Sequence, residues 1–391
     1  MSGRERSYLD YNATAPMRPE VVEAVARAAE LVGNPSSIHT EGRAARAAVE
    51  AARASVARLV GADPSHVIFT SGGTEAANAV LSPGLRRRGE REGPMRLLAG
   101  AGEHPCVLQG HRFGLAGLET IPLDGDGVVD LDWLDRRLRQ ARDERVLVSI
   151  QTANNETGVL QPVAKAAGLV REHGGLSHTD AVQAAGKIAL DLTALGADVL
   201  TFSAHKLGGP KGVGAIVLAS DHLDLGDRLI RGGGQERGRR AGTENVAGIV
   251  GFGAAADIAR QELEREGERL RRLRDACEAA LRRIAPSAIV FGAGATRLLN
   301  TLAFTIPGVR AETALILFDL EGVALSSGSA CSSGKVKLSH VLEAMAVPRP
   351  LAEGAMRVSL GWNSSEADVK NFAVACEKLV AALYKGRAAA A

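Results

Sequence analysis

The chain has 391 residues, of which 46% are hydrophobic and 24% are charged, and its formal net charge is +2 at pH 7. This length allows a large core and more than one domain. The balanced charge gives no strong attraction to nucleic acid or to an anionic membrane, and no apolar run approaches a transmembrane span. Residues 1–6 lack the apolar segment of a secretory signal, so we expect a cytoplasmic protein. Four cysteines without a Cys-x-x-Cys pair argue against a structural zinc site or a disulfide framework.

Short apolar segments alternate with helical stretches in the first two thirds of the chain. The strand-like segments are residues 66–70, 96–99, 146–151, 176–178, 199–202 and 213–218, and the helical ones are residues 36–60, 131–142 and 162–173. This alternation predicts an α/β fold with a mainly parallel sheet sandwiched by helices. A long charged helix over residues 244–283 then leads into a smaller α+β domain. The arginine-rich run 86–92 is interpreted as a solvated helix end.

A glycine turn follows the strand-like segment 66–70. Residues 71–74 read Ser-Gly-Gly-Thr, and a helix opens directly after them. Free backbone N–H groups and the positive end of the helix dipole make such a turn suitable for an anion, and Thr74 adds a hydroxyl donor. The turn is not a P-loop, because no Gly-Lys-Ser/Thr follows. By itself it is a weak signal, since many α/β proteins have one.

An acid and a lysine end two consecutive strand-like segments. Asp180 closes the first, and Ser203, His205 and Lys206 close the second. A lysine held away from water has a lowered pKa, and its neutral amine can form a Schiff base with a carbonyl. Pyridoxal phosphate chemistry needs this pair, because the acid keeps the ring nitrogen protonated. An isolated lysine is far more often a surface residue that starts a loop, and Asp180 taken singly is equally consistent with a helix N-cap.

A second chemical centre is the small-residue loop 325–334, which contains Cys331. Such a loop cannot pack a core, so we expect an exposed thiol that serves as a nucleophile or sulfur carrier. The alternative is an incidental loop cysteine. Cys277 and Cys376 fall in helical patterns and are predicted to be semi-buried packing residues. For Cys106 the sequence leaves the role open.

With these motifs in this order, the chain resembles the cysteine desulfurases, which are fold type I pyridoxal-phosphate enzymes of the class V aminotransferase type, and most closely the NifS/IscS-like group. The resemblance runs nearly end to end. It is carried by residues 8–16, 33–39, 69–75, 103–105, 153–158, 178–183, 203–206, 232–245, 326–331 and 357–361. Ala204 stands where the family commonly has glycine, but both residues are small.

The resemblance implies a role for each matching residue around the cofactor. Lys206 would form the Schiff base, Asp180 would pair with the ring nitrogen, and His104 would stack on the ring and move protons. Gln183 would contact the phenolic oxygen. Four residues would hold the phosphate, namely Gly73, Thr74, Ser203 and His205. Thr243 would reach the phosphate of a neighbouring subunit, which implies a homodimer.

The resemblance also implies a substrate and a product. Asn155 and Arg357 would clamp the carboxylate of L-cysteine, and the planar fork of arginine suits that task. Cys331 would take the sulfur as a persulfide while L-alanine leaves, and would pass it to an acceptor such as an iron–sulfur scaffold. A stable metal site is not expected, although Cys331 can serve as a transient iron–sulfur ligand together with a partner. The implied large domain spans residues 16–256, and residues 1–15 and 257–391 form the small domain, which carries the loop at about 326–340.

Two other functions stay open from the residues. A selenocysteine lyase, or another pyridoxal-phosphate enzyme of this fold, would share Lys206 and Asp180, whereas Cys331 and Arg357 favour desulfuration. A non-enzymatic sulfur-carrier scaffold would not need Lys206, Asp180 and His104 intact. The sequence does not reveal the sulfur acceptor.

Overall fold

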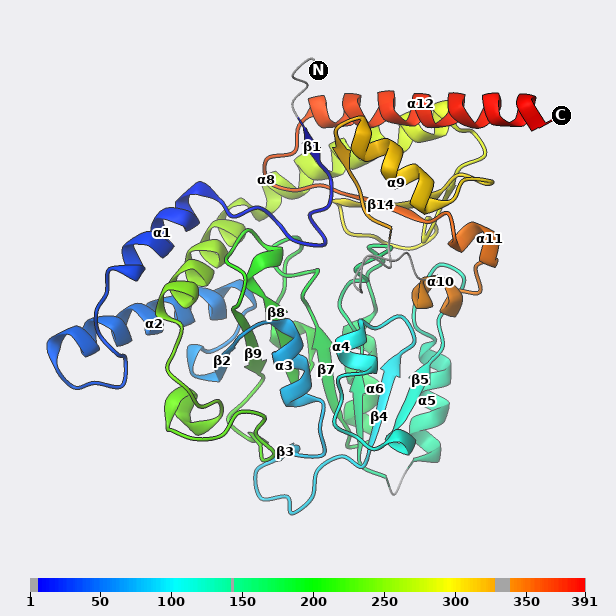
Figure 1. The fold of residues 1–391 in the computed structure, drawn as a ribbon. Helices are drawn as coiled ribbons and strands as arrows, with labels where there is room; N and C mark the ends of the chain where they lie inside the picture. The colour runs from blue at the N-terminus through cyan, green and yellow to red at the C-terminus, as the bar shows by residue number, and fades with distance from the viewer. Residues whose placement is uncertain (1–5, 142–143, 328–337, 391) are drawn as a thin grey trace.

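The computed structural model describes residues 6–141, 144–327 and 338–390, and its largest element is a seven-stranded sheet (Figure 1). In spatial order the strands are β2 (Val67–Thr70), β9 (Gly214–Leu218), β8 (Val199–Ser203), β7 (Leu176–Asp180), β6 (Val146–Ser149), β4 (Arg96–Gly100) and β5 (Leu118–Ile121). Strand β9 runs antiparallel to both of its neighbours, and the pairs from β8 to β5 are parallel. The predicted α/β fold with a mainly parallel sheet is therefore confirmed.

Helices cover both faces of this sheet, as the uninterrupted apolar strands require. In β8, Leu200 and Phe202 join a core with α2 (Thr40–Leu59), α5 (Leu131–Gln140), α6 (Val163–Glu172) and the first half of α8 (Val246–Ile284). Val199 points to the opposite face and packs with α3 (Gly73–Val80) and α4 (Pro105–Leu108). Successive residues of a strand alternate between faces, so every residue of β8 is buried.

A second, three-stranded antiparallel sheet lies above the first in Figure 1. It consists of β11 (Ile289–Val290), β12 (Thr301–Thr305) and β14 (Met356–Ser359), and it packs with α9 (Ala311–Leu320), α12 (Glu366–Ala390) and the second half of α8. The rings of Phe318 and Phe372 stack in its core at 5.9 Å. The division of the chain at residues 16 and 256 stays a prediction.

The N-terminal segment joins the second core. Strand β1 (Ser7–Tyr8) pairs in parallel with β13 (Val323–Ala324), and Leu9 is buried among the second core's residues. The remaining elements are α1 (Pro19–Ala29), β3 (Leu85–Arg87), α7 (Leu192–Leu195), β10 (Leu223–Leu225), α10 (His340–Ala344) and α11 (Arg349–Ala352).

The arginine-rich run 86–92 does not end a helix, so that interpretation is wrong. Its first residues form β3, which pairs antiparallel with β10. Leu85 is fully buried, and the Arg87 guanidinium donates to the backbone carbonyls of Gly174 and Gly175. The pairing with β10 and the hydrogen bonds of Arg87 join this run to distant parts of the chain, so its local sequence pattern does not determine its structure.

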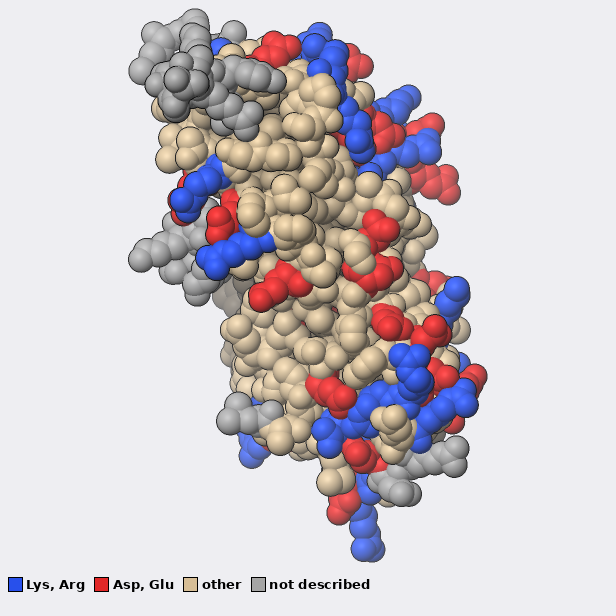
Figure 2. Space-filling view, turned by 90° about the vertical axis from the view of Figure 1, so that its right-hand side faces the viewer, with Lys and Arg blue, Asp and Glu red and all other residues tan. Residues whose placement is uncertain are grey.

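The surface carries charges of both signs. Basic and acidic side chains are interspersed on the face shown in Figure 2. Within the described part of the chain, none of the helices has the length and apolar character needed to cross a membrane. Nor do those residues form a cluster of three or more His, Cys, Asp or Glu side chains placed to hold a metal ion.

The fold positions a site at the carboxyl edge of the large sheet. The parallel strands end on one edge, which is where ligands bind in open α/β sheets. Strand β2 is followed by the glycine turn that opens α3, β4 by His104, and β6 by Asn155. Strand β7 ends at Asp180, and β8 is followed by Lys206.

Candidate active site

A cavity of about 240 Å³ opens at this edge. Because one water molecule occupies only about 30 Å³ of the liquid, the cavity is of ligand size and not a packing defect. Ten of the twelve residues predicted for the site line it, and they come from strands and loops far apart in the sequence. These residues are Gly73, Thr74, His104, Asn155, Asp180, Gln183, Ser203, His205, Lys206 and Arg357.

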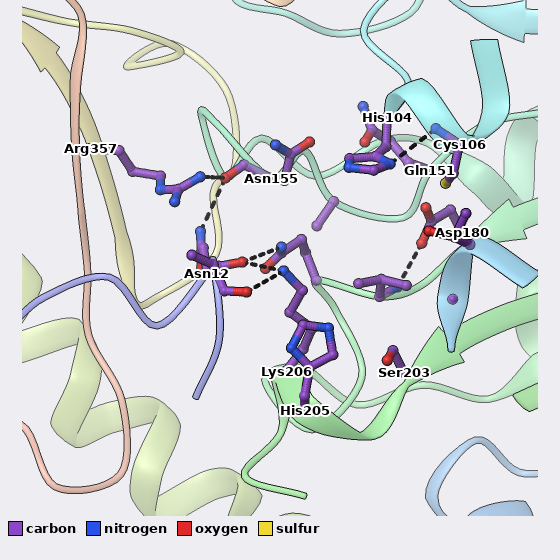
Figure 3. A pocket seen from close by; sticks show the side chains of 16 residues that line it. Asn12, His104, Cys106, Gln151, Asn155, Asp180, Ser203, His205, Lys206 and Arg357 are labelled. Atoms are coloured by element: carbon purple, nitrogen blue, oxygen red, sulfur yellow. Dashed lines mark hydrogen bonds between the residues drawn. The ribbon is translucent and has the colours of Figure 1, made fainter. Parts of the chain in front are cut away.

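Lys206 ends the short 3-10 turn Ala204–Lys206 that follows β8. Its Nζ donates hydrogen bonds to the backbone carbonyl oxygens of Asn12, at 2.6 Å, and of Ala13, at 2.8 Å (Figure 3). The neighbouring His205 ring lies 3.1 Å from the Thr14 hydroxyl through Nδ1. The N-terminal segment therefore forms the wall against which the lysine amine rests.

Asp180 is the last residue of β7 and is only 7% exposed. Its Oδ1 accepts a 2.8 Å hydrogen bond from the backbone N–H of Val182, and a turn follows instead of a helix, so Asp180 is not a helix N-cap. Burial raises its pKa from 3.8 to about 6, against the opposing effects of the Val182 N–H and the Lys206 charge. A cation bound beside this carboxylate would favour its ionised form.

Glu103 lies near Asp180 in a fully buried position that disfavours its charged form. Burial, and secondarily the charge of Asp180, raise the pKa of Glu103 well above its ordinary value. Its Oε1 accepts a hydrogen bond from the backbone N–H of Gln151. Asp180 is therefore the carboxyl group of this pair that ionises more readily.

His104 forms the N-cap of α4, and this contact defines its tautomer. The backbone N–H of Cys106 donates to His104 Nδ1 at 3.1 Å, so the proton of the neutral ring is on Nε2. Burial, followed by the charges of Lys206 and His340, lowers the pKa of His104 to about 4. The ring is consequently neutral at pH 7.

The glycine turn lies close to two neighbouring segments. A Cβ atom added to Gly73 would come within 2.8 Å of Val182 Cγ2 and 3.6 Å of Ser203 Cβ. Only glycine therefore fits here without a shift of Val182. Gly73 and Thr74 begin α3, and the first N–H groups of a helix lack intrahelical partners. These N–H groups suit an anion.

Arg357 reaches the site from β14, in the second sheet, and is 3% exposed. Its Nη1 donates to the Asn155 carbonyl oxygen at 2.8 Å (Figure 3). Its Nη2 donates to Asp10 Oδ1 at 2.7 Å. Its buried Nε–H has no hydrogen-bond partner among the described residues. Buried donors are normally paired, so this N–H indicates a site for an acceptor such as a ligand carboxylate.

The sequence reasoning missed Asn12, which is 1% exposed and joins several parts of the site. Its carbonyl oxygen accepts from Lys206 and from Gln183 Nε2, at 2.6 and 3.0 Å. Its Nδ2 donates to Thr301 Oγ1 at 2.9 Å. The available signal was the Asn-Ala-Thr segment that begins four residues after the end of β1, but its partners lie more than 140 residues away.

The cysteines differ in their surroundings. Cys106 lines the cavity, and burial, ahead of the charges of Asp180 and Glu103, raises the pKa of its thiol. Cys277 and Cys376 are fully buried in α8 and α12, as expected of packing residues. Cys331 lies outside the described residues.

Thr243 does not line the main cavity. It is exposed and lines a separate surface cavity together with Arg240 and Glu236. Its predicted contact with a neighbouring subunit's phosphate stays a prediction.

An amine, a buried acid, a glycine turn and a buried arginine in one cavity define a site of the pyridoxal-phosphate class. Comparisons with known proteins agree. The model of the family described as aminotransferase class-V matches residues 7–372. The cysteine desulfurase IscS of Dictyoglomus turgidum is 40% identical over 383 residues, which cover 95% of this chain and 94% of the relative.

Two further matches agree with these. The cysteine desulfurase NifS of Azotobacter vinelandii is 40% identical and covers 93% of this chain and 89% of its own length. The crystal structure of a NifS-like protein from Rickettsia africae superposes with a TM-score of 0.85 at 32% identity, covering 96% of this chain and 99% of the other.

The chain belongs to the aminotransferase class-V family and has the type I fold of its pyridoxal-phosphate enzymes. Its activity is that of a cysteine desulfurase, with pyridoxal phosphate as cofactor. The residues fit this cofactor, because the amine of Lys206 and the buried carboxylate of Asp180 face one cavity, and Gly73 leaves room where a Cβ would not fit.

Proposed function

We propose that Lys206, Asp180 and His104 carry out the desulfuration of L-cysteine in this cavity, and that the sulfur is left as a persulfide on Cys331. The observation that carries the proposal is that these three residues line one cavity with Arg357. Pyridoxal phosphate supplies an aldehyde that captures amines and a ring that withdraws electrons from the substrate.

Asp180 holds the proton on the ring nitrogen. A carboxylate with 7% exposure exerts a strong effect on a neighbouring cation, because little water screens it. Lys206 Nζ provides the amine that anchors the cofactor and, once released, removes the proton from the substrate α-carbon. The carbonyl oxygens of Asn12 and Ala13 hold that amine at the cavity wall.

His104 packs against the cofactor ring and donates from Nε2. Because its pKa is lowered to about 4, the ring is a neutral donor at physiological pH and adds no positive charge. Gln183 donates to the phenolic oxygen. The phosphate is held by the helix start at Gly73 and Thr74, together with Ser203 and His205.

Thr243 completes the phosphate site of a second copy of the chain, so the enzyme works as a homodimer. Its exposure in a surface cavity other than the one that Lys206 lines supports this role.

Arg357 and Asn155 bind the substrate carboxylate. The Arg357 Nε–H, which has no acceptor within the described ranges, supports this role. The attraction that Asp10 exerts on Nη2 orients the guanidinium fork. Arginine and carboxylate then form paired hydrogen bonds.

Cys331 acts as a thiolate and receives the sulfur. Its sulfur attacks the substrate sulfur, the carbon–sulfur bond of the substrate breaks, and its electron pair stays on carbon and takes up a proton. Alanine leaves, and the persulfide is passed to an acceptor such as an iron–sulfur scaffold in the cytoplasm. The large domain, residues 16–256, carries the cofactor site, and the small domain, residues 1–15 and 257–391, carries Arg357 and the Cys331 loop.

The test is Lys206→Ala, measured by the visible absorbance of the bound cofactor and by alanine release from L-cysteine. Both should be lost, because no other amine lines the cavity among the described residues. Lys165→Ala, at an exposed position of α6, is the control and should retain both. Alanine release by the Lys206 variant would refute the assignment.

A further inference from the structure

Lys187 has no assigned role in the proposed desulfuration, yet it contacts two residues of the site, Gln183 and Asn12. It lies in the turns between β7 and α7, four residues after Gln183. Its Nζ donates to Gln183 Oε1 at 2.9 Å and to Asn12 Oδ1 at 3.2 Å. Burial, followed by the charges of Lys206 and Arg357, lowers the pKa of Lys187 well below its ordinary value. Burying a lysine amine costs free energy of folding, so the hydrogen bonds that this amine makes are expected to serve a specific purpose.

Lys187 does not line the large cavity. It lines a smaller, separate cavity together with Lys206, Glu262 and Trp362. Its amine reaches the large cavity through Gln183 and Asn12, which both line it, and the contact with Gln183 is the shorter one.

The two partners of Gln183 determine which way its amide points. The Asn12 carbonyl oxygen can only accept, and it receives Gln183 Nε2 at 3.0 Å. Lys187 Nζ donates to the other end of the amide. The oxygen of Gln183 is thus held on the Lys187 side, and its nitrogen keeps a second N–H for a ligand. Without Lys187, the amide loses one of the two partners that distinguish its orientations, and only the Asn12 carbonyl oxygen still favours the one observed.

We propose that Lys187 is a positioning residue that fixes the Gln183 amide, so that an N–H and not the C=O meets the phenolic oxygen of bound pyridoxal phosphate. The inference rests on the proposed contact of Gln183 with that oxygen. In the reversed orientation, the amide oxygen of Gln183 faces the phenolic oxygen, which is itself an acceptor. Repulsion between the two oxygens then replaces the hydrogen bond to the charged phenolic oxygen.

The experiment measures the dissociation constant of pyridoxal phosphate for cofactor-free protein in a double-mutant cycle. The variants are Lys187→Met, Gln183→Ala and the double variant. Lys187→Met should weaken binding about tenfold, the size expected for one hydrogen bond to a charged group. In the Gln183→Ala background the same change should alter binding by less than about twofold, because Lys187 acts through the Gln183 amide and about twofold is the margin of additivity in such a cycle. Lys165→Met, at an exposed site, is the control and should bind as the wild type does.

A second readout is the absorbance maximum of the loaded protein without substrate. It should shift in Lys187→Met but not further when the same change is made in Gln183→Ala. Lys187→Gln, which keeps a polar side chain at the site, runs in the same cycle in case the methionine variant does not fold. Equal weakening in both backgrounds, or none in either, would overturn the inference. If Gln183→Ala itself binds pyridoxal phosphate as tightly as the wild type, the proposed role of Gln183 fails as well.

Discussion

Replacing Asp180 by Asn should weaken the binding of pyridoxal phosphate and remove the pH dependence that the ionisation of the Asp180 carboxyl group gives to it. The asparagine keeps an oxygen for the Val182 N–H but cannot carry charge. An opposite charge nearby shifts a pKa by about 1 to 3 units, and each unit corresponds to about tenfold in affinity. At pH 8 the variant should therefore bind the cofactor about 10- to 1000-fold more weakly than the wild type.

The pH dependence of this difference follows from the buried carboxyl group. In the unliganded protein, burial raises the pKa of Asp180 to about 6. The cation of the bound ring lowers that pKa, so the ionised form binds more tightly, and affinity falls as pH decreases below 6. At pH 5 only about one molecule in ten is ionised, so the ratio of the variant and wild-type dissociation constants should fall about tenfold between pH 8 and pH 5.

The assay titrates cofactor-free protein with pyridoxal phosphate at several pH values and follows tryptophan fluorescence or cofactor absorbance. Taking the ratio of the two proteins cancels the titration of the free cofactor and of the side chains that Asp180 does not affect. Asp191→Asn is a matched control, since Asp191 is an exposed N-cap where asparagine serves equally well. A ratio that does not change with pH would refute the reasoning.

Two further predictions concern the glycine turn and the substrate clamp. Gly73→Ala should weaken cofactor binding by at least about tenfold, since the added Cβ lies 2.8 Å from Val182 Cγ2. The control Gly114→Ala adds a Cβ that meets nothing within 4 Å and should leave binding unchanged. Equilibrium titration measures both variants, and equal affinities would contradict the prediction. Arg357→Lys should raise the KM for L-cysteine by about 10- to 100-fold while cofactor absorbance is retained, because a lysine cannot make paired hydrogen bonds with a carboxylate; steady-state kinetics would contradict this if KM stayed the same.

The large sheet could be predicted because its strands are uninterrupted apolar runs. β8 is buried at every position, so its sequence has an unmistakable pattern. β5 was missed because only Ile121 of its four residues is buried, and β3 was missed because its arginines mask a short edge strand. Strand pairing at such edges depends on contacts that a local pattern does not contain.

The site divides in the same way. Asp180 and Lys206 could be found because Asp180 ends one buried strand and Lys206 lies three residues after the end of the next, and parallel strands bring their carboxyl ends together. Asn12 and Lys187 could not be found, because their roles depend on hydrogen bonds that only the folded chain creates. The contact between Asn12 and Lys187 joins residues 175 positions apart.

The most direct test of the account locates the sulfur after one turnover. The loaded enzyme is mixed with L-cysteine, alanine is quantified, and each cysteine peptide is examined by mass spectrometry for an added sulfur atom. The account predicts a persulfide on Cys331, formed with one alanine per sulfur, and loss of both products in Cys331→Ser while cofactor absorbance is retained. Cys106 should remain unmodified, because burial raises the pKa of its thiol and leaves it neutral. A persulfide confined to Cys106, Cys277 or Cys376, or full alanine release by Cys331→Ser, would contradict the account.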